Sequence, residues 1–417
     1  MSEVLSCFDP SANPEAMLPV TESIERILSQ VNPVEGHEYL PLSEATSRVL
    51  AEELISLINV PQQTNSAMDG YAVAAESLQS GMPVKVIGQV FAGQRFHDQV
   101  RQGEAVEIMT GAPVPEGTDT ILIKEVCTVD KGELSFIGPV KKGQHVRLAG
   151  EDIQRGQVVL SPGHIIRPQE QGYIASLGLD KVKVYRKIKV AIFSTGDEVV
   201  EQGSALPENS IYDTNRFTLH GMLSRLGCEV IDFGIIDDTQ QAMSACLLEA
   251  SAKADMVISS GGVSMGKADY IKDSLEEVGQ IDFWKIAMRP GRPLAFGKVQ
   301  GTPFFGLPGN PVAVMVTFSQ FVQPALRKLM GQKQWAPVRM VAIAGERLKS
   351  RLHRTDYTRG VYEISEQGQL IVRSTGSQGS GILSSMVQAN CFIEIGDQYD
   401  EIAEGQTVII QPFSDLI

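Results

Sequence analysis

Three segments rich in glycine and proline follow apolar runs between residues 259 and 311, and they constrain the fold more than any other feature. Their sequences are SSGGVSMGKADY (259–270), MRPGRPLAFGK (288–298) and FGLPGNPVAV (305–314). Where strands of an open α/β sheet end in glycine-rich turns, ligands bind in the crevice that the turns form. Glycine lets backbone N–H groups approach an anion closely, and a following helix presents its positive end. We therefore expect the functional site in this crevice.

From residue 188 the chain alternates between strand and helix patterns. The expected elements are strands at 189–195, 229–236 and 255–260, helices at about 215–226, 240–253 and from near 269, a hairpin, and a long helix over 311–329. Successive strand–helix units indicate a parallel sheet that helices cover on both faces. The fold class predicted for this part of the chain is therefore α/β.

The remaining sequence is richer in strands. Residues 18–31 have helical spacing, but 38–185 contain short β-rich runs broken by glycine and proline, which is typical of small β-rich lobes. Beyond about residue 335 strand patterns return and predict a small C-terminal β domain. A chain of 417 residues is too long for one ordinary core, so we expect two to four domains.

The composition of the chain limits which functions and which cellular compartment are expected. The net charge of −14 argues against a general nucleic-acid partner, which would need a basic face. The five cysteines are scattered without a C-x-x-C pair, which suits a reducing cytoplasm. The first twenty residues lack the pattern of a signal peptide, and no apolar run approaches membrane-spanning length. We expect a cytoplasmic protein with no membrane partner.

The first glycine segment resembles a phosphate-binding P-loop only in part. Gly261, Gly266 and Lys267 have the required spacing after a strand, but Ala268 replaces the hydroxyl that would hold Mg²⁺. The pattern therefore argues against a nucleoside triphosphatase. A tight turn explains the pair Gly261 and Gly262, but it does not explain the polar run from Ser264 to Asp269.

Acidic residues recur where the predicted strands end, and a parallel sheet would place them along one rim. They are Asp197, Glu198, Asp213, Asp237, Asp238 and Asp269. Converging carboxylates suit a hard divalent cation such as Mg²⁺. The structural alternative is that acids such as Asp238 and Asp269 cap helices.

Basic residues and a helix start supply the opposite charge. The basic residues near the second segment are Lys285, Arg289, Arg292 and Lys298. Guanidinium and ammonium groups bind phosphates and other oxyanions, although a solvated hairpin is the plainer interpretation. The sequence Pro308-Gly309-Asn310-Pro311 is more specific, because Asn310 suits an N-cap and Pro311 a first helical turn, where an anion can bind.

Two further motifs look like turns by pattern alone. They are Asn65 to Tyr71 (NSAMDGY) and Met109 to Pro113 (MTGAP). The six histidines show no zinc-ligand spacing, and no Ser-His-Asp or Cys-His set is evident.

Seven motifs taken in order give the chain a close resemblance to the MoeA family of molybdopterin molybdenumtransferases, which includes the E domain of gephyrin. They are NSAMDGYAV, IMTGAPVPEG, FSTGDE, IYDTN, SSGGVSMGKADY, RPGRPLAFGK and GLPGNP. The resemblance implies insertion of molybdenum from molybdate into adenylylated molybdopterin, with release of AMP and formation of molybdenum cofactor. It also implies a divalent cation, usually Mg²⁺. No protein nucleophile is needed.

The resemblance also implies an architecture. A subunit would have a MogA-like parallel α/β domain at 186–332 and a β-rich lobe at 55–149. An elongated linking domain would combine 1–54 with 150–185, and a small β-barrel would occupy 333–417. Such subunits form a homodimer with a cleft between the α/β domain of one subunit and the lobe of the other. A MogA-type adenylyltransferase and molybdoenzyme maturation proteins are the implied partners.

Motif matching assigns roles to particular positions. The expected catalytic residues are Asp69, Thr110, Glu198, Asp238, Asp269, Lys285 and Arg289, of which Glu198, Asp238 and Asp269 are the candidate metal ligands. The expected substrate-binding residues are Gly261, Gly262, Ser264, Arg292, Pro308, Gly309, Asn310, Pro311, Arg359 and Ser380. Arg289 and Arg292 stand where many relatives have lysine, and Arg354 is an alternative to Arg359.

Two other functions remain open at the level of sequence. The α/β domain alone is also compatible with an adenylyltransferase that acts on molybdopterin, as in MogA. A non-catalytic scaffold of the gephyrin type is the alternative from a different class.

Overall fold

The computed structural model describes residues 17–79, 83–261, 274, 275 and 277–416. The chain divides into two compact units, one of Met1–Glu38 with Tyr185–Ile417 and one of Tyr39–Val184. Within the described ranges, no helix is both long enough and apolar enough to cross a bilayer.

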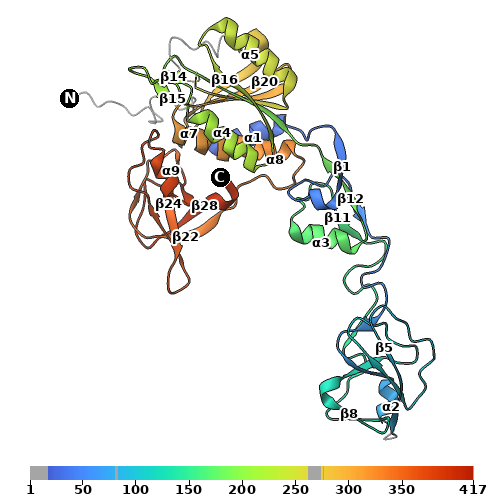
Figure 1. Ribbon diagram of the computed structural model, residues 1–417. Helices are drawn as coiled ribbons and strands as arrows, with labels where there is room; N and C mark the ends of the chain where they lie inside the picture. Colours follow the sequence, from blue (N-terminus) through green and yellow to red (C-terminus); the bar gives the residue numbers. More distant parts are fainter. Residues whose placement is uncertain (1–16, 80–82, 262–273, 276, 417) are drawn as a thin grey trace. The chain divides into compact units, whose positions relative to one another are not determined.

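The first unit contains a six-stranded sheet in the order β16-β13-β17-β21-β20-β18 (Figure 1). The strands are β13 (Lys189–Thr195), β16 (Glu229–Ile236), β17 (Met256–Ser260), β18 (Gly279–Lys285), β20 (Pro293–Val299) and β21 (Thr302–Leu307). The first four strands of this order are parallel, as predicted, whereas β20 and β18 are antiparallel to their neighbours. The difference arises because two residues, Gln300 and Gly301, connect β20 to β21, and so short a loop makes only a hairpin.

Helices cover both faces of this sheet. They are α1 (Val20–Gln30), α4 (Asn215–Arg225), α5 (Gln240–Lys253), α7 (Pro311–Thr317) and α8 (Gln323–Leu329). Helix α5 lies on one face, and α4 and α7 lie on the other (Figure 1). The long helix predicted over 311–329 is present, with a π-helical segment, η3 (Phe318–Val322), between α7 and α8. The helix expected from near residue 269 begins outside the described residues.

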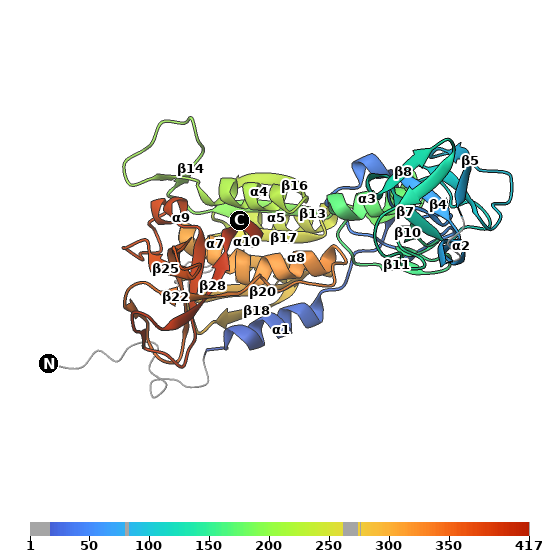
Figure 2. The ribbon, with the colours of Figure 1, turned by 90° about the horizontal axis from the view of Figure 1, so that it is seen from below.

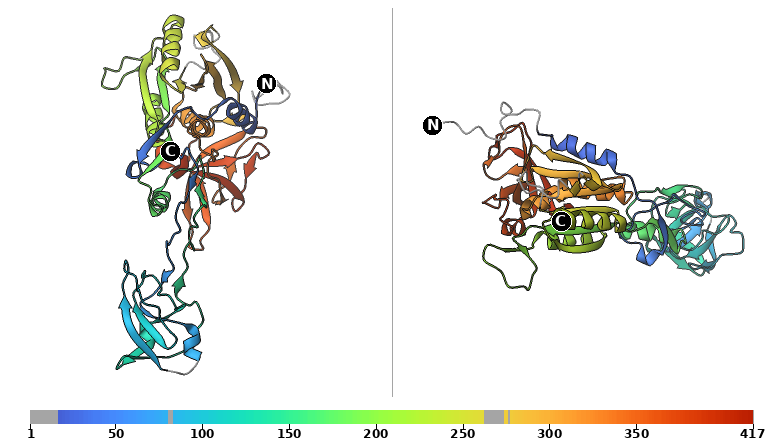
Figure 3. Two further views of the ribbon diagram at one scale, coloured as in Figure 1. Left: turned by 90° about the vertical axis from the view of Figure 1, so that its right-hand side faces the viewer. Right: turned by 90° about the horizontal axis from the view of Figure 1, so that it is seen from above.

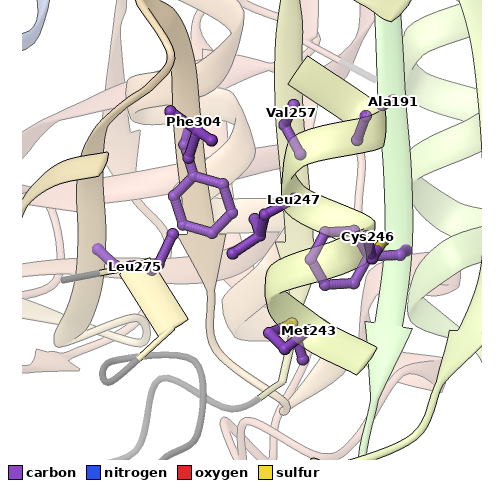
Figure 4. Close-up of a cluster of buried hydrophobic side chains, with 11 residues drawn as sticks. Ala191, Met243, Cys246, Leu247, Val257, Leu275 and Phe304 are labelled. Atoms are coloured by element: carbon purple, nitrogen blue, oxygen red, sulfur yellow. The ribbon is translucent and has the colours of Figure 1, made fainter. Parts of the chain in front are cut away.

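The core under α5 explains why the strands are almost continuously apolar. Met243 and Leu247 of α5 pack with Ala191, Val257 and Phe304 from three neighbouring strands, and all five residues are fully buried (Figure 4). Because the strands bury side chains on both faces, they show no polar alternation.

The C-terminal part of the first unit is a closed five-stranded barrel in the order β24-β25-β22-β28-β26, which returns to β24. Its strands are β22 (Met340–Ala344), β24 (Thr355–Ile364), β25 (Leu370–Ser374), β26 (Cys391–Ile395) and β28 (Thr407–Pro412). Around it lie β23 (Leu348–Lys349), β27 (Glu401–Ile402), α9 (Ser384–Gln388) and α10 (Phe413–Leu416). The barrel lies beside the α/β domain (Figure 3), and β19 (Met288–Arg289), which lies between β18 and β20 in the chain, pairs with β24 of the barrel.

The second unit is β-rich, as predicted. Its six-stranded sheet has the order β7-β4-β6-β5-β9-β8. These strands are β4 (Gly70–Val73), β5 (Val84–Val90), β6 (Glu104–Ile108), β7 (Thr120–Ile123), β8 (Cys127–Asp130) and β9 (Glu133–Phe136). The other elements are β1 (His37–Pro41), η1 (Leu42–Glu44), β2 (Leu54–Ile55), β3 (Asn65–Ser66), α2 (Ala75–Gln79), η2 (Lys124–Val126), β10 (Val146–Arg147), β11 (Val158–Leu160), α3 (Pro168–Ser176) and β12 (Lys181–Tyr185).

Candidate active site

A cavity of about 1150 Å³ opens at the carboxyl end of the parallel strands in the first unit. The ends of β13 and β17, the start of α7 and a loop from the barrel all contribute to its lining. Among the residues singled out from the sequence, those lining it are Glu198, Asp213, Asp238, Gly261, Arg289, Arg292, Pro308, Gly309, Asn310, Pro311, Arg354 and Ser380. The crevice predicted from the glycine-rich segments is therefore present.

The acidic part of the cavity contains Glu198 and Asp238. Thr195 Oγ1 donates a hydrogen bond to Asp238 Oδ1 at 3.4 Å. Burial, followed by the negative charges of Asp197 and Glu198, raises the pKa of Asp238 above its ordinary value. Neighbouring carboxylates that repel one another favour a bound cation, so these two side chains fit a hard divalent ion.

The basic part of the cavity comes from the segment that follows β18. Arg289 and Arg292 line it, and Arg354 of the barrel joins them while forming an ion pair with Asp356 (Nε–Oδ1 2.8 Å). Lys285 is the last residue of β18 and lies outside the set of lining residues. The cavity therefore has guanidinium groups that can bind oxyanions as well as carboxylates that can bind a cation.

The start of α7 has the predicted positions, with Asn310 at the N-cap and Pro311 as the first helical residue, but the side chain of Asn310 makes no cap hydrogen bond. The backbone N–H of Val312 donates to the carbonyl oxygen of Ser380 at 3.1 Å, which ties the barrel loop to the helix start. Asn215 Nδ2 of α4 donates to the carbonyl oxygen of Gly309 at 2.7 Å. The helix end thus has partners from two other elements that fix its position at the cavity.

Arg359 lies behind the loop that carries Ser380. Its side chain is 1% exposed, and it donates from Nε to Ser385 Oγ (3.0 Å) and from Nη2 to the carbonyl oxygen of Gly379 (2.9 Å). Burial and the nearby charge of Arg289 lower the pKa of Arg359 to about 10. Arg359 lines a second cavity of about 310 Å³, so Arg354 is the arginine of this pair that lines the larger cavity.

Asp69 and Thr110 meet in the second unit. Asp69 Oδ1 accepts hydrogen bonds from the backbone N–H and from the hydroxyl of Thr110, both at 2.7 Å. These two bonds lower the pKa of the exposed Asp69 below its ordinary value. The two motifs that looked like separate turns in the sequence are therefore one structural feature that presents an ionised carboxylate.

Some predicted residues lie outside the described part of the chain, namely Gly262, Ser264 and Asp269. In the part that is described, no three or more His, Cys, Asp or Glu side chains cluster as a ready metal site. Of the three metal ligands expected from the sequence, the described part of the chain therefore contains two, Glu198 and Asp238.

Sequence reasoning missed several polar residues of the cavity, among them two serines on neighbouring strands. Ser194 is the penultimate residue of β13 and Ser260 the last residue of β17; the two are register partners and each is 2% exposed. Both line the cavity, and neither hydroxyl has a hydrogen-bond partner within the described protein. The sequence signal for these residues was a serine near the end of an apolar strand. No spacing rule distinguishes such a serine from an ordinary strand residue.

A ligand cavity at the carboxyl edge of a parallel sheet defines the class of α/β enzymes that bind their ligands at strand ends. Three family profiles match the chain: the MoeA N-terminal region (domain I and II) at 18–178, the probable molybdopterin binding domain at 191–328 and the MoeA C-terminal region (domain IV) at 341–413. The chain belongs to the MoeA family and is a transferase of molybdenum cofactor biosynthesis.

Individual relatives agree with this assignment. The molybdopterin molybdenumtransferase of Haemophilus influenzae is 47% identical over 403 residues, which cover 96% of this chain and 100% of the relative. The enzyme of the same name from Nostoc sp. is 34% identical over 399 residues, covering 93% of this chain and 91% of the relative. The crystal structure of the molybdopterin biosynthesis MoeA protein from Pyrococcus horikoshii superposes with a TM-score of 0.83 at 30% identity, covering 95% of this chain and 100% of that one.

Proposed function

We propose that the protein inserts molybdenum from molybdate into adenylylated molybdopterin and releases AMP. The observation that carries the proposal is the cavity at the strand ends, which has the carboxylates Glu198 and Asp238 and the guanidinium groups of Arg289 and Arg292 in one lining. A diphosphate needs cationic side chains and a metal to offset its charge, and molybdate is a tetrahedral dianion that needs cationic donors.

The cation is assigned to Glu198 and Asp238, with Asp269 as a third ligand. A bound Mg²⁺ would supply charge neutralisation at the diphosphate. The carboxylates fit this role because a cation would offset what raises the pKa of Asp238, namely its burial and then the negative charges of Asp197 and Glu198. Asp238 is further oriented by the hydroxyl of Thr195.

The basic residues have the complementary roles of binding and orientation. Arg289 and Arg292 would bind the oxyanions, and Ser380 and the amides after Gly261 would complete the contacts. Lys285, which does not line the cavity, would contribute a further positive charge from the end of β18. Gly262 and Ser264, which lie outside the described residues, would add contacts to the substrate, as the family resemblance implies. Pro308, Gly309, Asn310 and Pro311 would shape the anion seat at the start of α7, with Arg354 lining it and Arg359 supporting the loop that carries Ser380.

A homodimer would complete the site. Asp69 and Thr110 belong to the second unit, and we propose that they act in the cleft formed with the α/β domain of another subunit. The exposed, ionised carboxylate of Asp69 is suited to contact a ligand from outside its own unit. A MogA-type adenylyltransferase would supply the substrate, and molybdoenzyme maturation proteins would accept the product.

Product analysis tests this function. Purified protein is incubated with adenylylated molybdopterin, molybdate and Mg²⁺, and AMP and molybdenum cofactor are quantified. We expect both products in equal amounts, and neither when molybdate is omitted. Consumption of ATP with formation of adenylylated molybdopterin would instead identify an adenylyltransferase. Absence of any turnover by a folded dimer would favour a scaffold.

A further inference from the structure

A buried arginine at the start of α4 joins three carboxylates from three different segments. Arg216 is 6% exposed. Its Nε lies 3.0 Å from Asp213 Oδ2, its Nη1 lies 2.7 Å from Asp232 Oδ2, and its Nη2 lies 2.5 Å from Glu201 Oε1. A planar guanidinium has the fixed donor directions that such a junction requires, whereas a lysine ammonium has not.

The first side of the junction fixes the segment that follows Glu198. Strand β14 (Val199–Val200) pairs with β15 (Ile211–Tyr212), and these two strands form the base of a loop that projects from the α/β domain (Figure 2). The N–H of Ile211 donates to the carbonyl oxygen of Glu198 at 2.8 Å. Glu201 and Asp213 lie directly after these two strands, so Arg216 holds both strands of the pair together next to Glu198.

The second side fixes the strand that leads to Asp238. Asp232 Oδ1 accepts a hydrogen bond from the N–H of Gly234 at 2.9 Å, and its Oδ2 faces Arg216. The register between β13 and β16 shifts here, and Gly234 has a φ of +78°. A bulge changes which residue emerges at the end of a strand. Asp232 therefore anchors the bulge that sets where Asp238 leaves the sheet.

We infer that Arg216 is a positioning residue that holds Glu198 and Asp238 in a fixed relation for binding of a divalent cation. The inference rests on the proposed function for the identity of that cation. Arg216 does not line the cavity and acts through Glu201, Asp213 and Asp232. Outer residues that orient metal ligands commonly change metal affinity by about 10- to 100-fold when they are substituted.

The test compares three variants with a control of the same kind. Arg216→Lys keeps the positive charge but loses the planar group of donors. Glu201→Gln weakens the contact with the segment after β14, and Asp232→Asn weakens the contact with the bulge of β16. The control is Arg339→Lys, which changes a two-point pair with Glu394 (2.9 and 3.0 Å) in the barrel. Mn²⁺ binding to the full-length protein is measured by electron paramagnetic resonance, and backbone amide exchange is measured by NMR.

Each variant has its own expected result. Arg216→Lys should weaken Mn²⁺ binding about tenfold or more and speed exchange at the amides of Ile211, Asp213 and Gly234. Glu201→Gln should speed exchange at Ile211 and Asp213 only, and Asp232→Asn at Gly234 only. Arg339→Lys should change neither measurement.

Two results would overturn the inference. One is an Arg216→Lys protein that melts earlier but binds Mn²⁺ within twofold of the parent, because the arginine would then act on stability alone. The other is exchange at the three amides that none of the variants changes. If Arg216→Lys does not fold, the amide exchange rates of Glu201→Gln and Asp232→Asn test the positioning role instead. If the parent binds no Mn²⁺, the proposed cation is wrong, and the exchange pattern alone supports or rejects the positioning role.

Discussion

At the scale of residues, the acids at the strand ends divide into two groups. Glu198, Asp238 and Asp213 line the cavity, but the carboxylate of Asp213 is buried and paired with Arg216, which leaves Glu198 and Asp238 as the candidate cation ligands of the described residues. The structural alternative, in which Asp238 caps α5, is wrong, because the N-cap is Thr239, whose hydroxyl accepts from the N–H of Ala242. Asp238 instead accepts a hydrogen bond from Thr195 and lines the cavity.

The raised pKa of Asp238 predicts how stability depends on pH without metal. The folded protein keeps this proton longer than the unfolded chain, so the unfolding free energy falls as pH rises from 3.8 through the raised pKa. Asp238→Asn should remove this fall. Mg²⁺ at ten times its dissociation constant should add about 1.4 kcal/mol to the parent and much less to the variant. Urea unfolding across pH, with EDTA or with Mg²⁺, measures both, and equal Mg²⁺ stabilisation of the two proteins would contradict the assignment.

Asp69 leads to a second prediction at this scale. Asp69→Asn keeps an oxygen that accepts from Thr110 but removes the charge, so the fold should persist. AMP release should fall at least about tenfold, because a hydrogen bond to a charged group contributes about 1.5–3 kcal/mol. Thr110→Ser, which keeps the hydroxyl, should retain most activity. Because the pKa of Asp69 lies below 3.8, its protonation should not shape the rate at neutral pH. Full activity of Asp69→Asn would exclude an electrostatic role.

At the scale of elements, periodicity predicted most of the α/β domain. The expected helix at 240–253 and the strand at 255–260 match α5 and β17, because apolar runs and helical spacing are local properties. The bulge at Gly234 and the π-helical segment Phe318–Val322 were not predictable, because tertiary partners produce them. The same reason explains why Arg216 escaped notice: only the folded chain brings its three carboxylates together.

A glycine at the end of β17 gives a prediction for these elements. A Cβ on Gly261 would lie 2.5 Å from the carbonyl oxygen of Thr195, and the φ of +91° disfavours any other residue. Gly261→Ala should therefore lower the unfolding free energy by about 1–3 kcal/mol. It should also displace Thr195, whose hydroxyl donates a hydrogen bond to Asp238. Gly221→Ala, in open space on α4, should stabilise by about 0.5–1 kcal/mol. Chemical denaturation of both variants checks the contrast, and a neutral Gly261→Ala would refute the close contact.

At the scale of the whole molecule, the four-domain division stays a prediction. Its limits are 1–54 with 150–185, 55–149, 186–332 and 333–417, and limited proteolysis tests them. The resemblance to a known family supplied the pairing of distant motifs such as those of Asp69 and Thr110. Residue patterns alone could not predict this pairing, because the hydrogen bond between Asp69 and Thr110 joins positions 41 residues apart.

A buried amide pair predicts that the α/β domain and the barrel unfold together. Gln320 Nε2 of η3 donates to Gln411 Oε1 of β28 at 2.7 Å, and both side chains are buried. Gln320→Leu leaves Gln411 without this partner and should cost about 1–3 kcal/mol. The double change to leucine should cost less than the sum of the single changes. Calorimetry should show one shifted transition for the first unit, and strictly additive effects would contradict the coupling.

The central claim is that the cavity at the strand ends binds the diphosphate and the cation together. A crystal structure of the protein with adenylylated molybdopterin, molybdate and Mg²⁺ tests it most directly. We predict density for the diphosphate within reach of Arg292 and Asn310, with the cation on Glu198 and Asp238. A substrate bound in the smaller cavity beside Arg347 and Lys349, with no cation on those two carboxylates, would contradict the account.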